Sequence, residues 1–516
     1  MAISPRAPGT GMETPLKPPS PPAPRVVAPP PGSAVLALGL LVAVVLATAT
    51  FQQLPMALLT LLALTAVAAL AAVLVFARRR WISVVYLSSL ALVSLPIDKY
   101  LGYRDHVGGW PGLRVAAADL LMLCLLPSVV LGWRSHGSPR PLPRSLIFVY
   151  GLLLAWYALS SLGAPRRDLA AFEMASAVHA LLLAFCAAAL FRRTYLAPIL
   201  IVLAAQLTLH SSFAWAQAIT GRSLGLGLGR GPAALVLESF EGGEQRIRPA
   251  GLFDHPIVYA DSLLLGLPIL VAGVYGTRSR LRIGLGCAVA FGLSGLVLTL
   301  SRGAWISSAL AMVLLVVLAW RCGLLDLRAL RRSLGTGLAV LALVSLLFGP
   351  LIVQRFAASR EGNLRVRFEL NGIALRMIAA HPFVGVGLNN FIPAMAAYDP
   401  HDVRRYFPAV VHNLYLLEAA ESGLPGLLLF LALWGLMLAI AWRRLTSLEE
   451  PSLQWFALGI VAALSGFLFS QLTDFSHRLE PLRSVVWVDI GLLFGSLRGS
   501  LRTVRRGAVL RPPEAP

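Results

Sequence analysis

Apolar stretches long enough to cross a bilayer recur along nearly the whole chain, and this feature constrains the fold more than any other. A spanning helix needs about 20 predominantly apolar residues. Only 13% of the 516 residues are charged and 57% are hydrophobic, whereas about a quarter of the residues of a soluble domain are charged. Because backbone groups inside lipid must satisfy one another, such stretches form helices. The sequence therefore predicts an all-α, polytopic integral membrane protein.

We predict about 12–14 transmembrane helices, with a large and partly helical outer loop. The chain divides into a proline-rich, disordered tail (1–33), helices at 34–220, 255–353 and 412–497, loops at 221–254 and 354–411, and a basic tail at 498–516. The candidate spans are 34–51, 55–77, 81–97, 115–133, 145–163, 174–191, 195–220, 255–276, 283–300, 304–320, 334–353, 413–442, 453–473 and 484–497.

The distribution of basic residues orients these spans. The two tails and alternate short loops carry most of the Lys and Arg, while most Asp and Glu lie on the other side. By the positive-inside rule, the basic side is cytoplasmic, which places both termini inside and the two long loops outside. The net charge of +20 then reflects membrane topology. The sequence has no basic domain of the kind that binds nucleic acid, so we expect no nucleic-acid partner.

The outer loop at 354–411 contains apolar residues at helical spacing, which predicts an ordered helix at about 364–380. Arg365 and Arg376 are about three turns apart on this helix and share a face, whereas Arg367 lies off it. Arginine side chains bind phosphate oxygens in pairs, so these residues are candidate substrate ligands. The alternative is a solvated helix in which arginines pair with Glu369.

Two further arginines lie where spans begin. Arg248 precedes the span that starts near residue 255, and Arg302 lies at an outer turn between two spans. A charge at such a position is costly unless it is paired or faces water, which favours a functional role. The alternative for Arg302 is an interfacial arginine that snorkels beside Trp305.

Polar residues also open the long span near residue 413, in the stretch HNLYLLEAAESGLPG. His412 is a candidate proton acceptor near neutral pH, and Asn413 either caps the helix or binds a hydroxyl group. Glu418 and Glu421 share a face of the helix but point away from His412, so we expect them to pair with arginines elsewhere. GLPG (423–426) predicts a break or kink in this helix.

Four motifs together resemble the bacterial O-antigen ligase and O-antigen polymerase superfamily. They are RPAGLFDHP, TLSRGAWIS, AHPFVGVGLNNF and HNLYLLEAAESGLPGLLLF, in this order within about residues 245–430. The resemblance implies a helical membrane glycosyltransferase of the bacterial inner membrane that uses no metal ion or other cofactor. Its partners would be membrane lipids, an undecaprenyl-pyrophosphate-linked glycan as donor, and lipid A–core or a growing glycan as acceptor.

The resemblance also implies roles for individual residues. His412 would be the catalytic or acceptor-positioning histidine on the periplasmic face. Arg248, Arg302 and one of the three arginines at 365, 367 and 376 would hold the pyrophosphate, with Arg302 acting in catalysis. Asn413, Glu418 and Glu421 would contribute to substrate binding.

Two other functions fit parts of the sequence. A polymerase of the same superfamily shares every motif above and differs only in its acceptor. A transporter or flippase of lipid-linked glycans is a different class, and it predicts internal repeats and charged residues deep within spans. The chain shows no obvious repeat, but Asp119, Asp261 and Asp489 lie in or near spans and are compatible with a transporter.

Overall fold

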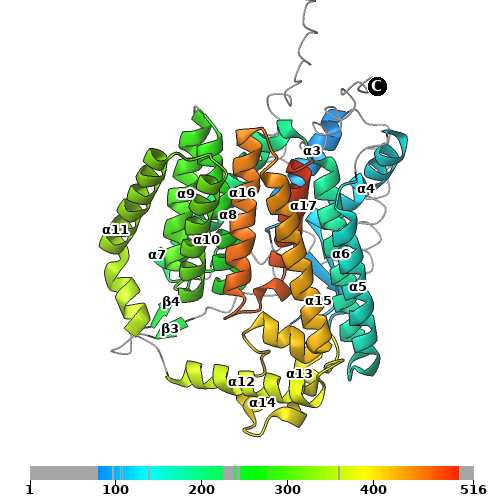
Figure 1. Ribbon diagram of the computed structural model, residues 1–516. Coiled ribbons are helices and arrows are strands. Elements are labelled where there is room, and N and C mark those ends of the chain that lie inside the picture. The colour runs from blue at the N-terminus through cyan, green and yellow to red at the C-terminus, as the bar shows by residue number, and fades with distance from the viewer. Residues whose placement is uncertain are drawn as a thin grey trace, which may run out of the picture.

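The protein is a bundle of roughly parallel helices with a smaller helical layer across one end, as Figure 1 shows. The computed structural model describes residues 79–95, 98–104, 106, 109–136, 140–222, 224, 237–239, 245–278, 280–357 and 361–498. The predicted tail at 1–33, the first two predicted spans and nearly all of the basic C-terminal tail lie outside these residues.

The predicted spans from 81–97 onward each overlap one helix of the bundle. Within the described residues, eight helices are long and apolar enough to cross a membrane, or nine if the bent α11 is counted as one span. The chain is therefore an all-α, multi-pass membrane protein. The bundle helices are α3 (Arg79–Leu92), α4 (Ala117–His136), α5 (Arg144–Ser160), α6 (Arg167–Leu190), α7 (Leu196–Thr220), α8 (Pro256–Gly276), α9 (Arg280–Leu298), α10 (Arg302–Arg321), α11 (Leu327–Ala357), α15 (Leu414–Leu445), α16 (Pro451–Ser470) and α17 (Leu482–Ser496).

The described strands form two small antiparallel hairpins outside the bundle core. β1 (Asp98–Leu101) pairs with β2 (Leu113–Ala116), and β3 (Leu237–Ser239) pairs with β4 (Gln245–Ile247). Arg114 on β2 donates from Nε to Asp98 Oδ2 at 2.6 Å and from Nη1 to Glu480 Oε2 at 3.1 Å. Arg114 therefore links the first hairpin, through a hydrogen bond, to the segment that precedes α17.

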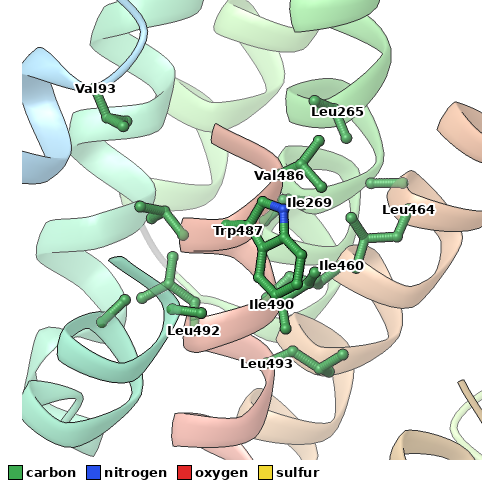
Figure 2. Packing of buried hydrophobic residues seen from close by; sticks show 14 of the residues in the cluster. Val93, Leu265, Ile269, Ile460, Leu464, Val486, Trp487, Ile490, Leu492 and Leu493 are labelled. Atoms are coloured by element: carbon green, nitrogen blue, oxygen red, sulfur yellow. The ribbon is translucent and has the colours of Figure 1, made fainter. Parts of the chain in front are cut away.

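The core of the bundle lies around α17, α8 and α16, and Figure 2 shows this packing. Val486 and Leu493 of α17 are completely buried, as is Ile460 of α16. Small residues bring α17 close to α6: a Cβ atom built on Gly491 would lie 2.5 Å from the carbonyl oxygen of Ala184. Close approach at small residues is the usual way in which membrane helices gain van der Waals contact.

The layer across the end of the bundle contains the predicted loop helix. α12 (Glu361–Ala380) covers the predicted range 364–380 and is followed by the short helices α13 (Phe391–Ala394), η3 (Met395–Tyr398) and α14 (Val403–Tyr406). This layer has its own hydrophobic cluster, in which Leu370, Ile373 and Met377 of α12 are completely buried. These four helices, α12, α13, η3 and α14, are called the outer layer below. The hydrophobic cluster includes Leu417 of α15, so the outer layer is packed onto the N-terminal end of that helix.

The long helix α15 is broken where GLPG predicts a kink. Gly423 has φ 74° and ψ 175°, which are not helical angles. The residues before Gly423 pack against the outer layer, and those after it cross the bundle beside α5. Because of the break, α15 packs against the outer layer with its first residues and crosses the bundle with the rest.

Candidate active site

The loop between α16 and α17 connects segments that are far apart in the sequence. The guanidinium of Arg367 donates from Nη1 to the carbonyl oxygen of Thr473 at 3.0 Å. The backbone N–H of Leu414 donates to the carbonyl oxygen of Asp474 at 2.9 Å. A Cβ atom built on Gly303 would lie 3.1 Å from Thr473 Oγ1. The outer helix α12, the start of α15 and the start of α10 therefore meet at Thr473–Asp474.

Arg248 reaches the same region from the segment before α8. Its Nε donates to the carbonyl oxygen of Thr299 at 3.0 Å, in the turn that leads into α10. The backbone N–H groups of Ala250 and Gly251 donate to Gln217 Oε1 at 2.9 and 3.0 Å. Gly251 has φ +62°, and a Cβ atom there would lie 2.9 Å from the carbonyl oxygen of His210. The glycine of the RPAG turn is needed for this close approach.

Arg302 is the first residue of α10, and its position is set by the turn that precedes it. Trp305 anchors this turn, because its indole Nε1–H donates to the carbonyl oxygen of Leu296 at 2.8 Å. Arg302 is half-buried and next to Gly303, which faces Thr473. The structure thus places Arg302 beside the loop that Arg367 contacts.

His412 lies immediately before α15, between two aromatic rings. The centroid of its ring is 5.5 Å from that of Phe475 and 6.1 Å from that of Phe407. Burial, together with the charges of Arg367 and His255, lowers the pKa of His412 to about 4. Among the described residues, its Nδ1 is buried without a hydrogen bond of ordinary geometry. At neutral pH the imidazole is therefore uncharged and able to accept a proton.

Asn413 is the N-cap of α15. Its Oδ1 accepts hydrogen bonds from the backbone N–H groups of Tyr415 and Leu416, both at 3.0 Å. This is the capping role that an asparagine at a helix start commonly performs. It fixes the direction in which α15 leaves the site and so holds His412 in place.

Asp474 is the acidic group of the site, and its side chain is buried at 8% exposure. Burial raises the pKa of Asp474 to about 6, while the Phe475 N–H and the charges of Arg367 and Arg248 lower it. Below the loop, Ser476 Oγ donates to Asp261 of α8, and Gln471 Nε2 donates to Ser476 Oγ at 2.8 Å. The loop that carries Asp474 is thereby hydrogen-bonded to the helices on which it rests.

The three candidate arginines of α12 have different surroundings. Arg367 is the one that contacts the loop after α16. Arg376 donates from Nε to the carbonyl oxygen of Tyr398 at 2.7 Å, within the outer layer. Arg365 is exposed, and Glu369 pairs with His401 at 2.5 Å. Of the arginines predicted on this helix, the structure brings Arg367 together with His412, Arg248 and Asp474.

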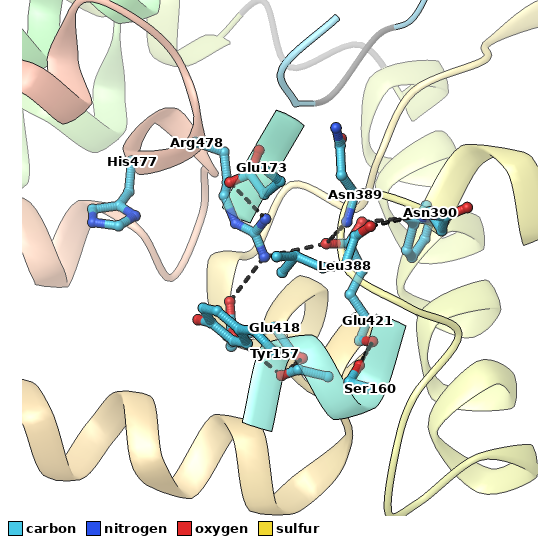
Figure 3. A network of polar contacts seen from close by, with 12 residues as sticks. Tyr157, Ser160, Glu173, Leu388, Asn389, Asn390, Glu418, Glu421, His477 and Arg478 are labelled. Atoms are coloured by element: carbon cyan, nitrogen blue, oxygen red, sulfur yellow. Dashed lines mark hydrogen bonds and ion pairs between the residues drawn. The ribbon is translucent and has the colours of Figure 1, made fainter. Parts of the chain in front are cut away.

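A buried network of charges lies beside the site, and Figure 3 shows its geometry. Arg478 forms ion pairs with Glu173 of α6 at 3.0 Å, Glu418 at 2.9 Å and Glu421 at 3.2 Å. Arg483 also pairs with Glu173. Burial alone would lower the pKa of Arg478, but the three carboxylates raise it well above its ordinary value. Glu418 and Glu421 are thus paired with an arginine, as their spacing predicts, although that arginine was not identified.

The two glycine-containing motifs pack against one another through their backbones. Glu421 Oε2 and Oε1 accept hydrogen bonds from the backbone N–H groups of Asn389 and Phe391 at 2.8 and 3.1 Å. A Cβ atom built on Gly385 would lie 2.4 Å from the carbonyl oxygen of Glu421. The segment AHPFVGVGLNNF therefore supports α15, and neither its glycines nor Glu421 needs a ligand to account for its position.

Several residues of the site were not predicted from the sequence. Thr473, Asp474, Arg478 and Arg483 all lie in the short polar stretch LTDFSHRLEPLR between two predicted spans. The signal was present, since a dense group of charges flanked by spans is unusual. The predicted residues Arg248, Arg302, Arg367 and His412 converge on this stretch, whereas Glu418 and Glu421 are about 1% exposed and lie within the neighbouring network.

This arrangement is suited to binding an anion and transferring a proton. The charge of Arg367 acts on both Asp474 and His412, and that of Arg248 acts on Asp474. Arg302 begins α10 next to Gly303, which faces Thr473. Asp474 and His412 are both able to accept a proton. Multiple arginines are typical of sites that bind phosphate groups. No group of three potential metal ligands occurs among the described residues.

The fold and the site define a multi-pass membrane protein with an arginine-rich polar site at the end of its helical bundle that α12 crosses. Residues 287–431 match the family model described as O-antigen ligase. This match supports membership of the chain in the O-antigen ligase and polymerase superfamily, and it suggests a glycosyltransferase-like membrane enzyme.

No curated protein matches the chain. A chain from a solved structure of a peptidoglycan synthase complex that coordinates polymerization and crosslinking is 16% identical, with a TM-score of 0.40, over 69% of this chain and 98% of that chain.

Proposed function

We propose that the protein is a glycosyltransferase that moves a glycan from an undecaprenyl-pyrophosphate donor to lipid A–core on the periplasmic face of the inner membrane. The observation that carries the proposal is the convergence of three arginine-bearing segments and the His412 helix on Thr473–Asp474. The O-antigen ligase match at 287–431, which includes Arg302, Arg367 and His412, supports it.

The arginines have a direct role in such a reaction. When the glycosidic bond breaks, negative charge accumulates on the departing pyrophosphate. Arg248, Arg302 and Arg367 are already positioned by the fold, so they stabilise this charge without reorganisation at the moment of reaction. No metal ion is required for this role. Of the α12 candidates, we assign the role to Arg367 because of its contact with the loop at Thr473.

The acceptor hydroxyl releases one proton as it attacks the anomeric carbon, and Asp474 and His412 are the two groups of the site that are able to take it. Asp474 is ionised above about pH 6, and His412 is neutral above about pH 4. A pyrophosphate bound to Arg367 would offset the positive charge that now lowers the pKa of His412. Donor binding therefore makes the imidazole a stronger base, and direct attack by the hydroxyl inverts the anomeric carbon.

Glu418 and Glu421 have a supporting role in this scheme. Both are bound to Arg478, which lies four residues after Asp474. They hold the loop of Asp474 against α15 and are not in direct contact with substrate. Asn413 likewise positions His412 by capping its helix.

Two of the three acidic residues that favoured a transporter, Asp119 and Asp261, have partners within the bundle, whereas the third, Asp489, is buried in α17. Asp119 pairs with His179 at 2.9 Å and with Arg114 at 3.7 Å, and Asp261 accepts a hydrogen bond from Ser476. These contacts connect α4 with α6 and β2, and α8 with the loop after α16. They favour an enzyme with one site at its outer end over a transporter with charged groups along a path.

The test is a lipopolysaccharide gel from a strain in which the gene is deleted. The strain is complemented with wild-type protein, with His412→Ala or with Asp474→Asn, and membrane levels of each variant are checked by immunoblot. A ligase predicts free lipid A–core in the deletion strain, together with polymer that remains on its lipid carrier. Wild-type protein should restore the ladder, and the two variants should not.

The other outcomes identify the alternatives. Core capped by a single repeat unit would assign the protein as a polymerase instead. An unchanged ladder in the deletion strain would contradict both, and a search for a different glycan product would follow. Full complementation by His412→Ala and by Asp474→Asn would contradict the assignment of the proton acceptors.

A further inference from the structure

The loop helix α12 is apolar on its outward face as well as on its buried face. Leu370, Ile373, Ala374 and Met377 are buried against the outer layer. On the opposite side, Phe368 is 72% exposed and Leu375 is 56% exposed. These two residues are seven apart and so lie on one stripe of the helix. A helix that faced water on this side would carry polar residues there.

Arginines border this apolar stripe on both sides. Arg365 and Arg376 lie about a quarter turn to one side of it, and Arg367 lies about a quarter turn to the other. An apolar stripe between basic residues is typical of helices that lie in the plane of a membrane surface. There, the apolar side chains enter the acyl boundary and the basic ones meet lipid phosphates.

The position of α12 relative to the spans fits the same surface. α16 has 20 residues, which at about 1.5 Å per residue spans the hydrocarbon core of about 30 Å. Arg367 reaches Thr473, three residues beyond the end of α16. α12 therefore lies beyond the hydrocarbon core by the length of an arginine side chain, which is the depth of the lipid head groups. Figure 1 shows α12 lying across the bundle, at a steep angle to α16.

The apolar stripe also lies near a part of the bundle surface that would face lipid. Phe469 and Leu472, at the outer end of α16, are 44% and 46% exposed. Phe368 is adjacent in sequence to Arg367, which is bound to the residue after Leu472. The apolar surface of the spans thus continues onto α12.

We propose that the outward face of α12 docks in the head-group layer of the outer leaflet, with Phe368 and Leu375 among the upper acyl chains and the exposed Arg365 and Arg376 on lipid phosphates. The membrane then fixes the helix that supplies Arg367. This contact is independent of the reaction that the protein catalyses.

The test measures the surroundings of α12 in a bilayer. The four native cysteines are replaced by alanine in the full chain, and Phe368→Cys, Leu375→Cys or Arg404→Cys is introduced and spin-labelled. Arg404 is an exposed residue of α14, on the same outer layer, and serves as the matched control. Each protein is placed in phosphatidylethanolamine–phosphatidylglycerol nanodiscs. Collision of the label with oxygen, which enters lipid, is compared with collision with a water-soluble nickel chelate.

We expect the ratio of oxygen to nickel collisions to be severalfold higher at positions 368 and 375 than at 404. Equally low ratios of oxygen to nickel collisions at all three positions would mean that α12 is surrounded by water, and this would overturn the proposal. Low collision with both reagents at 368 and 375 would mean that protein, such as a second copy of the chain, covers the face, and this would also overturn it. None of these results depends on whether the protein transfers glycans.

Discussion

His412 and Asp474 reach one site from the ends of different spans, and the pKa of each depends on burial and on the charge of Arg367. Burial moves the two pKa values in opposite directions, because it disfavours the charged form of each group. Both groups are consequently in their proton-accepting form at neutral pH. The site has this property before any substrate binds, because the fold has already placed the arginines nearby.

The ionisation of Asp474 leads to a prediction about pH. Its pKa is raised to about 6, so the carboxylate is lost as pH falls through that value. His412 remains neutral there, because its pKa is lowered to about 4. We expect kcat/KM for glycan transfer, which reports the free enzyme, to fall with decreasing pH below about 6. The measurement uses purified protein in nanodiscs with a lipid-linked donor, and a rate that stays constant through this range would contradict the role of Asp474.

A second prediction separates Arg367 from the other arginines of the outer layer. Arg367→Gln removes a preorganised charge from the departing pyrophosphate, and we expect it to lower kcat/KM by about 10²–10³-fold. Arg405→Gln is the control, since Arg405 has an 84% exposed side chain and, within the part of the chain that the structure describes, forms its ion pair with Asp402. Similar rates for the two variants would show that Arg367 does not act on the donor.

At the scale of elements, α15 depends on a single glycine. Gly423 has φ 74° and ψ 175°, a region of backbone conformation that is available almost only to glycine. A Cβ atom there would lie 2.0 Å from the carbonyl oxygen of Phe383. The break therefore joins α15 to the segment that follows α12, and it keeps the His412 end of the helix against the outer layer.

Substitution of Gly423 tests the backbone contact between α15 and the segment that follows α12. We expect Gly423→Ala to lower the free energy of unfolding by about 1–3 kcal/mol or more and to reduce transfer activity. Gly435→Ala in the same helix is the control, because a Cβ atom there meets nothing within 4 Å. Thermal unfolding in detergent would compare the two. Equal stabilities would mean that the backbone contact at Gly423 is dispensable.

The elements were more predictable than their contacts. Apolar runs gave the spans, helical periodicity gave α12, and GLPG gave the kink, because each of these depends on neighbouring residues. The four motifs predicted Arg248, Arg302 and His412 as site residues, and their assignment stays a prediction. The loop at 471–478 was missed, because the importance of Asp474 and Arg478 comes from contacts with residues tens to hundreds of positions away. The choice among the three arginines of α12 also needed the fold, since only the packing of the outer layer decides which one reaches Thr473.

At the scale of the whole molecule, Arg478 and Arg483 connect parts of the bundle that are distant in sequence. Glu173 is 2% exposed and binds both arginines. Removing one member of a buried group of charges leaves the others uncompensated, which costs about 3–5 kcal/mol. The network thus contributes to the folded state.

The corresponding prediction concerns stability. We expect Glu173→Ala to lower the free energy of unfolding by about 3–5 kcal/mol, because both arginines lose a partner. Asp168→Ala on the same helix is the control, since Asp168 pairs with Arg166 at the surface and surface pairs contribute little. Chemical denaturation in mixed micelles is the measurement. A Glu173→Ala protein as stable as the control would show that the network is not required for folding.

The separation of these partners along the chain has a consequence for how the protein is made. Glu173 is synthesised 305 residues before Arg478, so α6 enters the membrane while the residues that neutralise its carboxyl do not yet exist. An unpaired carboxylate in a bilayer is costly, and the helix must therefore remain at the insertion machinery, or carry a protonated Glu173, until the last spans arrive. A chain that stopped at the end of α16 would lack both Arg478 and Arg483 and would leave Glu173 without either of its partners, which gives membrane quality control a means of detecting incomplete molecules.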